Sequence, residues 1–70
     1  MERYSVYIVF KNGQDYQFET NTNVLYLEPI QVNGAQIIMT KDEHGINMNQ
    51  VQKMEVVRIG HGKIGEIVNG

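Results

Sequence analysis

The sequence feature that most constrains the fold is the segment from Tyr4 to Thr20. In this segment an apolar run and an alternating run flank the dipeptide Asn12-Gly13. Asn-Gly between two such runs is typical of a tight β-hairpin, because both residues tolerate the positive φ that the turn demands. The segment therefore predicts two antiparallel strands joined by a short loop.

Two registers of this hairpin are compatible with the turn. A two-residue loop pairs Tyr7 with Phe18, whereas a three-residue loop with a bulge at Gly13 pairs Val6 with Phe18. A slip of one residue exchanges the two faces of a strand, so the register that separates apolar from acidic side chains is favoured. That register is the bulged one. Its apolar face consists of Tyr4, Val6, Ile8, Phe10, Tyr16 and Phe18.

The first strand also carries apolar side chains on its other face, because Tyr7 and Val9 point away from the apolar set in both registers. A strand that is apolar on both faces is usually covered on both faces. We therefore expect a central strand, covered by the far wall of a barrel or by a second subunit. The six large aromatic rings are also more than one face of a small core readily hides. The candidate interface or ligand surface consists of Tyr7, Val9 and Tyr26.

Composition restricts how such a chain is stabilised. Its 70 residues indicate a single domain, and a chain of this size buries only about 60% of its unfolded surface. The chain has no cysteine, so neither a disulfide nor a cysteine-based zinc site supports the core. Self-association is an alternative source of burial. We expect the β domain to span residues 1–60 and residues 61–70 to form a glycine-rich, flexible tail.

Charge and hydropathy exclude some functions. The formal net charge is -2, without a cluster of basic residues, so general affinity for nucleic acid is not expected. The apolar run near the N-terminus is too short to span a membrane, and no signal-peptide cleavage region follows it. These features predict a cytoplasmic protein that does not bind membranes.

Further along the chain, alternating apolar residues predict more strands. Val24–Glu28 is expected to be a strand, and Pro29 favours an edge position or a bend. A second hairpin is predicted over residues 24–40, with its turn at Asn33-Gly34. The polar residues 41–45 are typical of an exposed loop.

The C-terminal part of the chain leaves two interpretations open. The pattern favours a short strand to about Met48, one 3₁₀ turn, and a last strand over Lys53–Ile59. A helix over 49–59, with Asn49 as its N-cap, is the alternative, although its β-branched residues oppose it. In the tail, a short additional strand is compatible with the spacing of Ile64, Ile67 and Val68.

Two families of small β-barrels show a resemblance. The alternation of Val6 to Gly13 and the spacing of Ile46, Val51 and Met54 resemble the strands of Sm-like proteins. The 3₁₀ turn before the last strand is similar to that of SH3-like barrels. Both resemblances imply an all-β, antiparallel barrel or strongly bent sheet of five or six strands. Asn47-Met48-Asn49 replaces the basic RNA-contacting segment of the Sm-like family, so no RNA-binding residue is carried over.

No catalytic or metal-binding constellation is complete. Residues Gly60–Gly65 match the dinucleotide motif G-x-G-x-x-G, but too few residues follow to form the required helix. Asp42, Glu43, His44 and His61 are metal-ligand types, but adjacent residues of a loop rarely converge on one ion. We therefore predict no catalytic residue, no metal site and no cofactor.

These observations predict a non-enzymatic binding module that self-associates and has an unknown protein partner. Small cysteine-free β modules are also used by phages and mobile elements to block or sequester host components, which gives a possible role by analogy. The alternative hypothesis is an Sm-like protein that binds nucleotides or single-stranded nucleic acid, because surplus tyrosines provide stacking surfaces.

Overall fold

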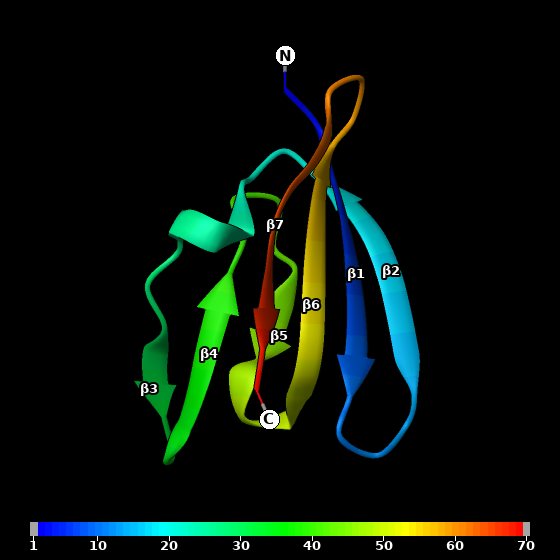
Figure 1. Cartoon of the computed structure of the whole chain (residues 1–70). Coiled ribbons are helices and arrows are strands. Elements are labelled where there is room, and N and C mark those ends of the chain that lie inside the picture. The colour runs from blue at the N-terminus through cyan, green and yellow to red at the C-terminus, as the bar shows by residue number, and fades with distance from the viewer. Residues whose placement is uncertain (1, 70) are drawn as a thin grey trace.

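The computed structural model describes residues 2–69, which form an all-β structure of two antiparallel sheets (Figure 1). In chain order, the elements are β1 (Tyr4–Phe10), β2 (Asp15–Thr20), the 3₁₀ helix η1 (Val24–Tyr26), β3 (Ile30–Val32), β4 (Ala35–Met39), β5 (Gly45–Asn47), the 3₁₀ helix η2 (Met48–Gln50), β6 (Val51–Arg58) and β7 (Gly62–Val68). The strand order is β2-β1-β6-β7 in the larger sheet and β3-β4-β5 in the smaller one.

The all-β, antiparallel prediction is confirmed, but its details are not. The described residues form seven strands instead of five or six, and these strands do not close into a barrel. The additional strand comes from the glycine-rich C-terminal segment. No helix in residues 2–69 is long and apolar enough to cross a membrane.

The first hairpin has the bulged register. Val6 lies opposite Phe18 in the β1–β2 pair. Gly13 has a φ of 89°, and its N–H donates to the carbonyl oxygen of Phe10 at 2.9 Å. β1 lies between β2 and β6, so its predicted central position is also confirmed.

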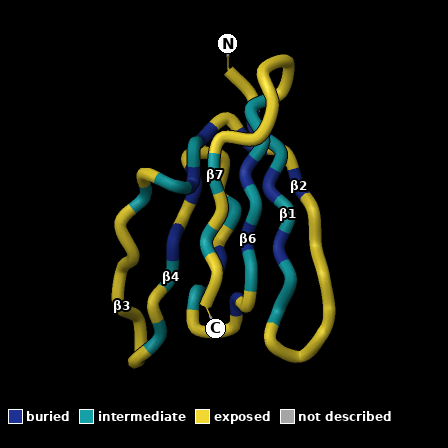
Figure 2. The backbone as a smooth tube through the Cα atoms, viewed as in Figure 1, coloured by how far each residue is buried: buried dark blue, intermediate teal, exposed yellow. Residues whose placement is uncertain are grey.

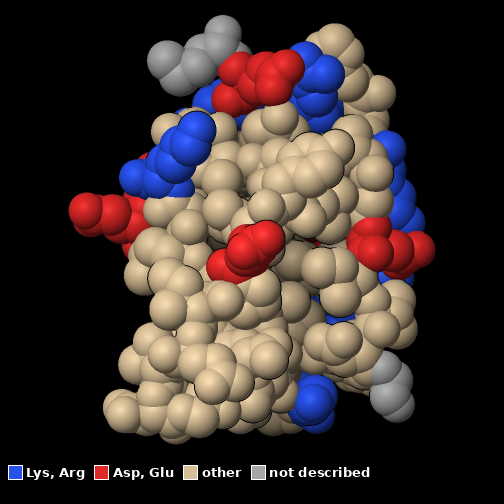
Figure 3. Space-filling view, turned by 90° about the vertical axis from the view of Figure 1, so that its left-hand side faces the viewer, with Lys and Arg blue, Asp and Glu red and all other residues tan. Residues whose placement is uncertain are grey.

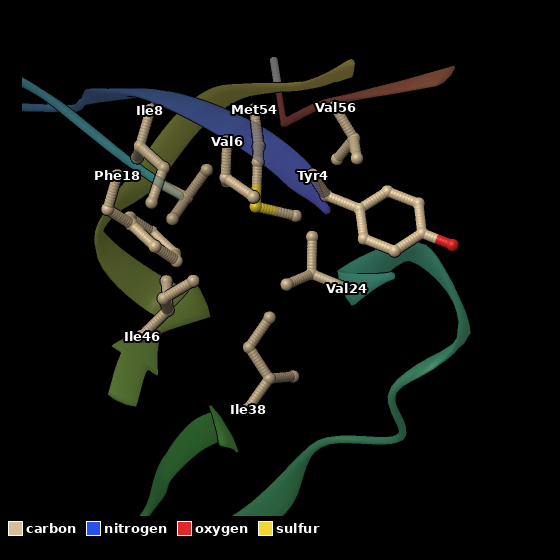
Figure 4. Packing of buried hydrophobic residues seen from close by; sticks show 10 residues of the cluster. Tyr4, Val6, Ile8, Phe18, Val24, Ile38, Ile46, Met54 and Val56 are labelled. Carbon is tan, nitrogen blue, oxygen red and sulfur yellow. The ribbon is translucent and has the colours of Figure 1, made fainter. Parts of the chain in front are cut away.

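The hydrophobic core lies between the two sheets (Figure 4). Its buried side chains come from β1, β2, η1, β4, β5 and β6, so neither sheet has a core of its own. They are Tyr4, Val6, Ile8, Phe18, Val24, Ile38, Ile46, Val51, Met54 and Val56. Tyr16, which was expected on the same apolar face, stays 53% exposed and stacks its ring on Phe18 at a centroid distance of 5.7 Å.

The second hairpin joins β3 to β4 at the predicted turn. Asn33 and Gly34 both have positive φ, as a type I′ turn requires, and Val32 lies opposite Ala35. Pro29 precedes β3, which lies at the edge of the smaller sheet as expected. All three residues of β3 are exposed, and none belongs to the core (Figure 2).

The prediction of a strand over Val24–Glu28 is wrong. Residues 24–26 form the 3₁₀ helix η1, because the side-chain oxygen of Asn23 accepts a hydrogen bond from the backbone N–H of Leu25 at 3.1 Å. The turn directs Val24, which is 2% exposed, into the core. A local cap and one buried anchor therefore outweigh the β propensity of the segment.

The segment before the last hairpin agrees with the favoured interpretation. The 3₁₀ turn is η2, and the residues that follow it form the strand β6, so the helical alternative for 49–59 is wrong. β6 is not the last strand, however. It pairs with β1 on one side and with β7 on the other.

The C-terminal segment is not the loose tail that its glycines predicted. Residues 62–68 form β7, which confirms the alternative of an additional strand. β7 pairs along β6, Ile67 packs against the core, and Lys63 forms ion pairs with Glu55 and Glu66. These contacts with β6 stabilise a strand that a sequence pattern with several glycines does not reveal.

Candidate interaction surface

The smaller sheet presents an apolar outer face, which we call the β3–β4 surface. Ile38 points into the core, so its neighbours Ile37 and Met39 on β4 point to the opposite side. Directly paired residues share a face, which places the apolar residues of β3 on this side as well. The β3–β4 surface consists of Ile30, Val32, Ala35, Ile37 and Met39.

The β3–β4 surface is uncharged, and three of its five residues are exposed while Ala35 and Ile37 are half-buried. Ile30 is 60% exposed, Val32 50% and Met39 49%. Residues 29–40 contain no charged residue. In Figure 3, which views the molecule from the side of β3, the lower part of the face is almost entirely free of charged atoms. Exposed apolar residues that lie next to one another on one sheet face are typical of interaction sites.

A polar network fixes this sheet relative to the larger one. The carboxylate of Asp42, in the turn between β4 and β5, accepts hydrogen bonds from the hydroxyl of Thr20 at 2.6 Å and from that of Thr40 at 2.7 Å. Thr20 belongs to β2 and is fully buried. These hydrogen bonds, with that to Thr20 first, lower the pKa of Asp42 from 3.8 to about 2. The expected exposed loop 41–45 is therefore attached to the other sheet through the carboxylate of Asp42.

A second contact joins the same turn to β2. The ring of His44 stacks on that of Phe18 with a centroid distance of 4.4 Å. The backbone N–H of His44 donates to the hydroxyl of Thr40 at 2.9 Å. The orientation of the β3–β4 surface is thus fixed from its β5 side, whereas β3 itself stays free of such contacts.

The outer face of the larger sheet, where Tyr7 and Val9 lie, is charged. The hydroxyl of Tyr7 donates to Asp15 at 2.8 Å, which raises the pKa of the tyrosine. Val9 lies opposite Asp15 on one side and Lys53 on the other. Four residues of β6 and β7 form a cross-strand network of ion pairs on this face: Lys53, Glu55, Lys63 and Glu66. Tyr7 and Val9 are therefore half-buried among their neighbours' side chains within one chain.

Tyr26 lies elsewhere. It is 85% exposed on η1 and borders two surface hollows, of about 260 Å³ and 330 Å³, both of which also include Tyr4 and Asn23. Because Tyr4 and Tyr7 lie on opposite faces of β1, the structure separates Tyr26 from the Tyr7–Val9 face. The three candidate residues therefore do not form one surface.

The candidate metal ligands are also separated into two turns. Asp42 and His44 lie between β4 and β5, whereas His61 lies in the turn between β6 and β7. Within residues 2–69, no group of three or more His, Asp or Glu side chains is placed to hold a metal ion. The glycine motif at 60–65 forms this second turn and the start of β7, with no helix after it.

The sequence did contain a signal for the β3–β4 surface. The twelve residues from Pro29 to Thr40 lack any charge in a chain that is 20% charged. Alternation alone did not show whether the second hairpin lies inside the fold or at its margin, so the signal could not be recognised as a surface.

No protein-family model matches the chain, and no curated protein or solved structure matches it either. A function for the chain therefore has to come from its own residues.

Proposed function

We propose that the protein is a non-enzymatic interaction module that associates with copies of itself through the β3–β4 surface. The observation that supports this function is the exposure of Ile30, Val32 and Met39 on an uncharged strand pair. Apolar area removed from water stabilises association by roughly 25 cal/mol per Å² before the entropic cost of binding is subtracted. A domain this small gains burial by association that its own core does not provide.

The charged face of the larger sheet fits this function less well. Two copies that met through it would have to separate or desolvate the ion pairs of Lys53 and Lys63 with Glu55 and Glu66. Desolvation of ion pairs offsets much of the gain from contact. We therefore assign association to the β3–β4 surface and not to the Tyr7–Val9 face.

Val32→Lys is expected to weaken self-association more than tenfold. The lysine would place a charge in the apolar contact, and a tenfold change in the dissociation constant requires only about 1.4 kcal/mol. Val68→Lys is the matched control, because Val68 is 63% exposed on the charged face of β7. Sedimentation equilibrium at several protein concentrations measures both constants, and circular dichroism shows that each variant is folded.

Two results would contradict this function. One is a wild-type chain that stays monomeric up to about 100 µM, a concentration at which even weak complexes form. The other is an equal loss of association in Val32→Lys and Val68→Lys. It would show that an added lysine weakens association wherever it is placed, and not specifically on the β3–β4 surface.

Tyr26 supports a second candidate function, the binding of nucleotides or single-stranded nucleic acid, which would extend the Sm-like resemblance. Its exposed ring borders one hollow with Arg58 and the other with Lys41. Bases stack on exposed aromatic rings, and cations favour the phosphate. NMR titration with a panel of nucleotides and short oligonucleotides is expected to shift the resonances of Tyr26, and Tyr26→Ala to abolish binding. The absence of shifts across the panel would eliminate this function.

A further inference from the structure

We infer that the copies join edge to edge, with β3 of one chain pairing antiparallel to β3 of the other around Gln31. This inference rests on the proposed self-association and adds its geometry. The product is one continuous sheet of six strands, three from each copy, with a two-fold axis at Gln31.

The backbone of β3 is open to such pairing. No other strand among residues 2–69 lies beside β3 on the side away from β4. A two-residue hairpin loop closes on a hydrogen-bonded pair, and bonded and non-bonded pairs alternate along antiparallel strands. Val32 and Ala35 flank the loop. The N–H and C=O of Gln31, one residue earlier, therefore point away from β4 to the open edge.

The side chains of β3 fit a second copy of the same strand. Antiparallel pairing around Gln31 places Ile30 opposite the second copy's Val32, and Val32 opposite the second copy's Ile30. The two Gln31 side chains meet on the other face, where each amide can both donate and accept. The apolar residues of both copies then form one stripe, which continues the β3–β4 surface across the axis.

Charge distinguishes β3 from the edge strands of the larger sheet. β2 carries Asp15 and Glu19, and β7 carries Lys63 and Glu66. Charged residues on edge strands are a common protection against pairing with another chain. β3 has no charged residue, so no like charges meet when two copies pair. A second copy is the partner for which this lack of charge matters most.

The same edge limits the assembly to two chains. Pro29 has no backbone N–H, and the Asn33-Gly34 turn ends the strand, so the edge presents only three residues. A two-fold pairing uses this edge in both copies at once. The structure thus predicts a closed dimer and not an open filament.

Disulfide formation by Gln31→Cys tests the geometry, because the chain contains no other cysteine. Residues directly opposite each other on antiparallel strands have Cα atoms about 4.5–5.5 Å apart, within the range that a disulfide accepts. Gln36→Cys is the matched control, because Gln36 is an exposed glutamine directly opposite Gln31 on β4. In the paired dimer the two Gln36 positions are three strand spacings apart, about 14 Å, which is too far for a disulfide.

Under mild oxidation at micromolar concentration, Gln31→Cys is expected to form covalent dimers at least about tenfold faster than Gln36→Cys, because pairing raises the effective concentration of the two thiols. Equal rates, in a chain that sedimentation shows to associate, would overturn edge pairing and leave the proposed function intact. A wild-type chain that remains monomeric by sedimentation would overturn both.

Discussion

Ile8→Ala is expected to lower the free energy of unfolding by about 2–5 kcal/mol, the usual cost of removing a large buried aliphatic side chain. Ile8 is 1% exposed and packs in the core between the two sheets. A domain of 70 residues has a total stability of only about 4–10 kcal/mol at roughly 0.05–0.15 kcal/mol per residue. The substitution would therefore remove a large share of the stability, which chemical denaturation with urea measures.

Val9→Ala provides the matched control for this prediction. Val9 is the next residue of β1, but it lies half-buried on the opposite, charged face of the sheet. The expected loss is about 1 kcal/mol or less, since the side chain is small and only partly removed from water. Equal losses in the two variants would mean that the two faces of β1 are buried alike, which would contradict the position of the core.

Asp42→Asn is expected to destabilise the protein at neutral pH and to have progressively less effect as the solution becomes acidic. The carboxylate accepts hydrogen bonds from Thr20, from Thr40 and from the backbone N–H of Asn21. An asparagine retains one acceptor oxygen but replaces the other with an NH₂ donor. Both threonine hydroxyls donate to the same carboxylate oxygen, which the asparagine oxygen can replace, but these hydrogen bonds lose their negatively charged acceptor. The N–H of Asn21, which donates to the other oxygen, then faces the NH₂ donor, so the contact between the two sheets weakens.

The pH range of this effect follows from the pKa of Asp42, which is lowered in the folded protein from 3.8 to about 2. A carboxyl group with a depressed pKa stabilises the fold fully above its unfolded pKa and loses this contribution as the pH falls through the folded pKa. The difference between wild type and variant should thus be constant above about pH 4 and decline between about pH 4 and pH 2. Thermal unfolding followed by circular dichroism across this range measures the difference.

The stability of Asp42→Asn is compared with that of the wild type because other carboxyl groups also have lowered pKa values. The pKa of Glu2 is lowered chiefly by its hydrogen bond with Tyr4, and that of Glu55 chiefly by its hydrogen bond with Lys63. Both groups contribute acid sensitivity to the wild type and the variant alike. Glu43→Gln, at the exposed residue next to Asp42, should follow the wild-type curve. A difference between wild type and Asp42→Asn that stays constant down to about pH 2 would contradict the role of the ionised carboxylate.

The two hairpins and the 3₁₀ turn were predictable from the sequence because their signals are local. The dipeptides Asn12-Gly13 and Asn33-Gly34 are by themselves typical of tight turns, and the pattern of apolar residues then selected the register of the first hairpin. The segment Val24–Glu28 was misassigned for the opposite reason. The conformation of this segment depends on the cap at Asn23 and on the burial of Val24 by strands distant in sequence. Neither feature changes the alternation of apolar and polar residues from which strands are predicted.

The candidate surface was less predictable than the fold. Tyr7 and Val9 were selected because apolar side chains on the second face of a strand suggested that another sheet or subunit packs on them. In the folded chain, polar residues of the neighbouring strands surround them instead. Such partners come from strands distant in sequence, so the pattern of one strand does not show them. The exposed position of β3 likewise depends on the core ending at β4, which is a property of the assembled sheets.

The strand β3 contributes no side chain to the core, although it carries part of the surface to which we assign self-association. Substitutions at Ile30, Gln31 and Val32 can therefore change how the copies associate at little cost to folding. Evolution, or a designer, could diversify this tripeptide while the scaffold of β1, β2 and β6 stays constant. The hairpin would then be a variable association element on a constant scaffold.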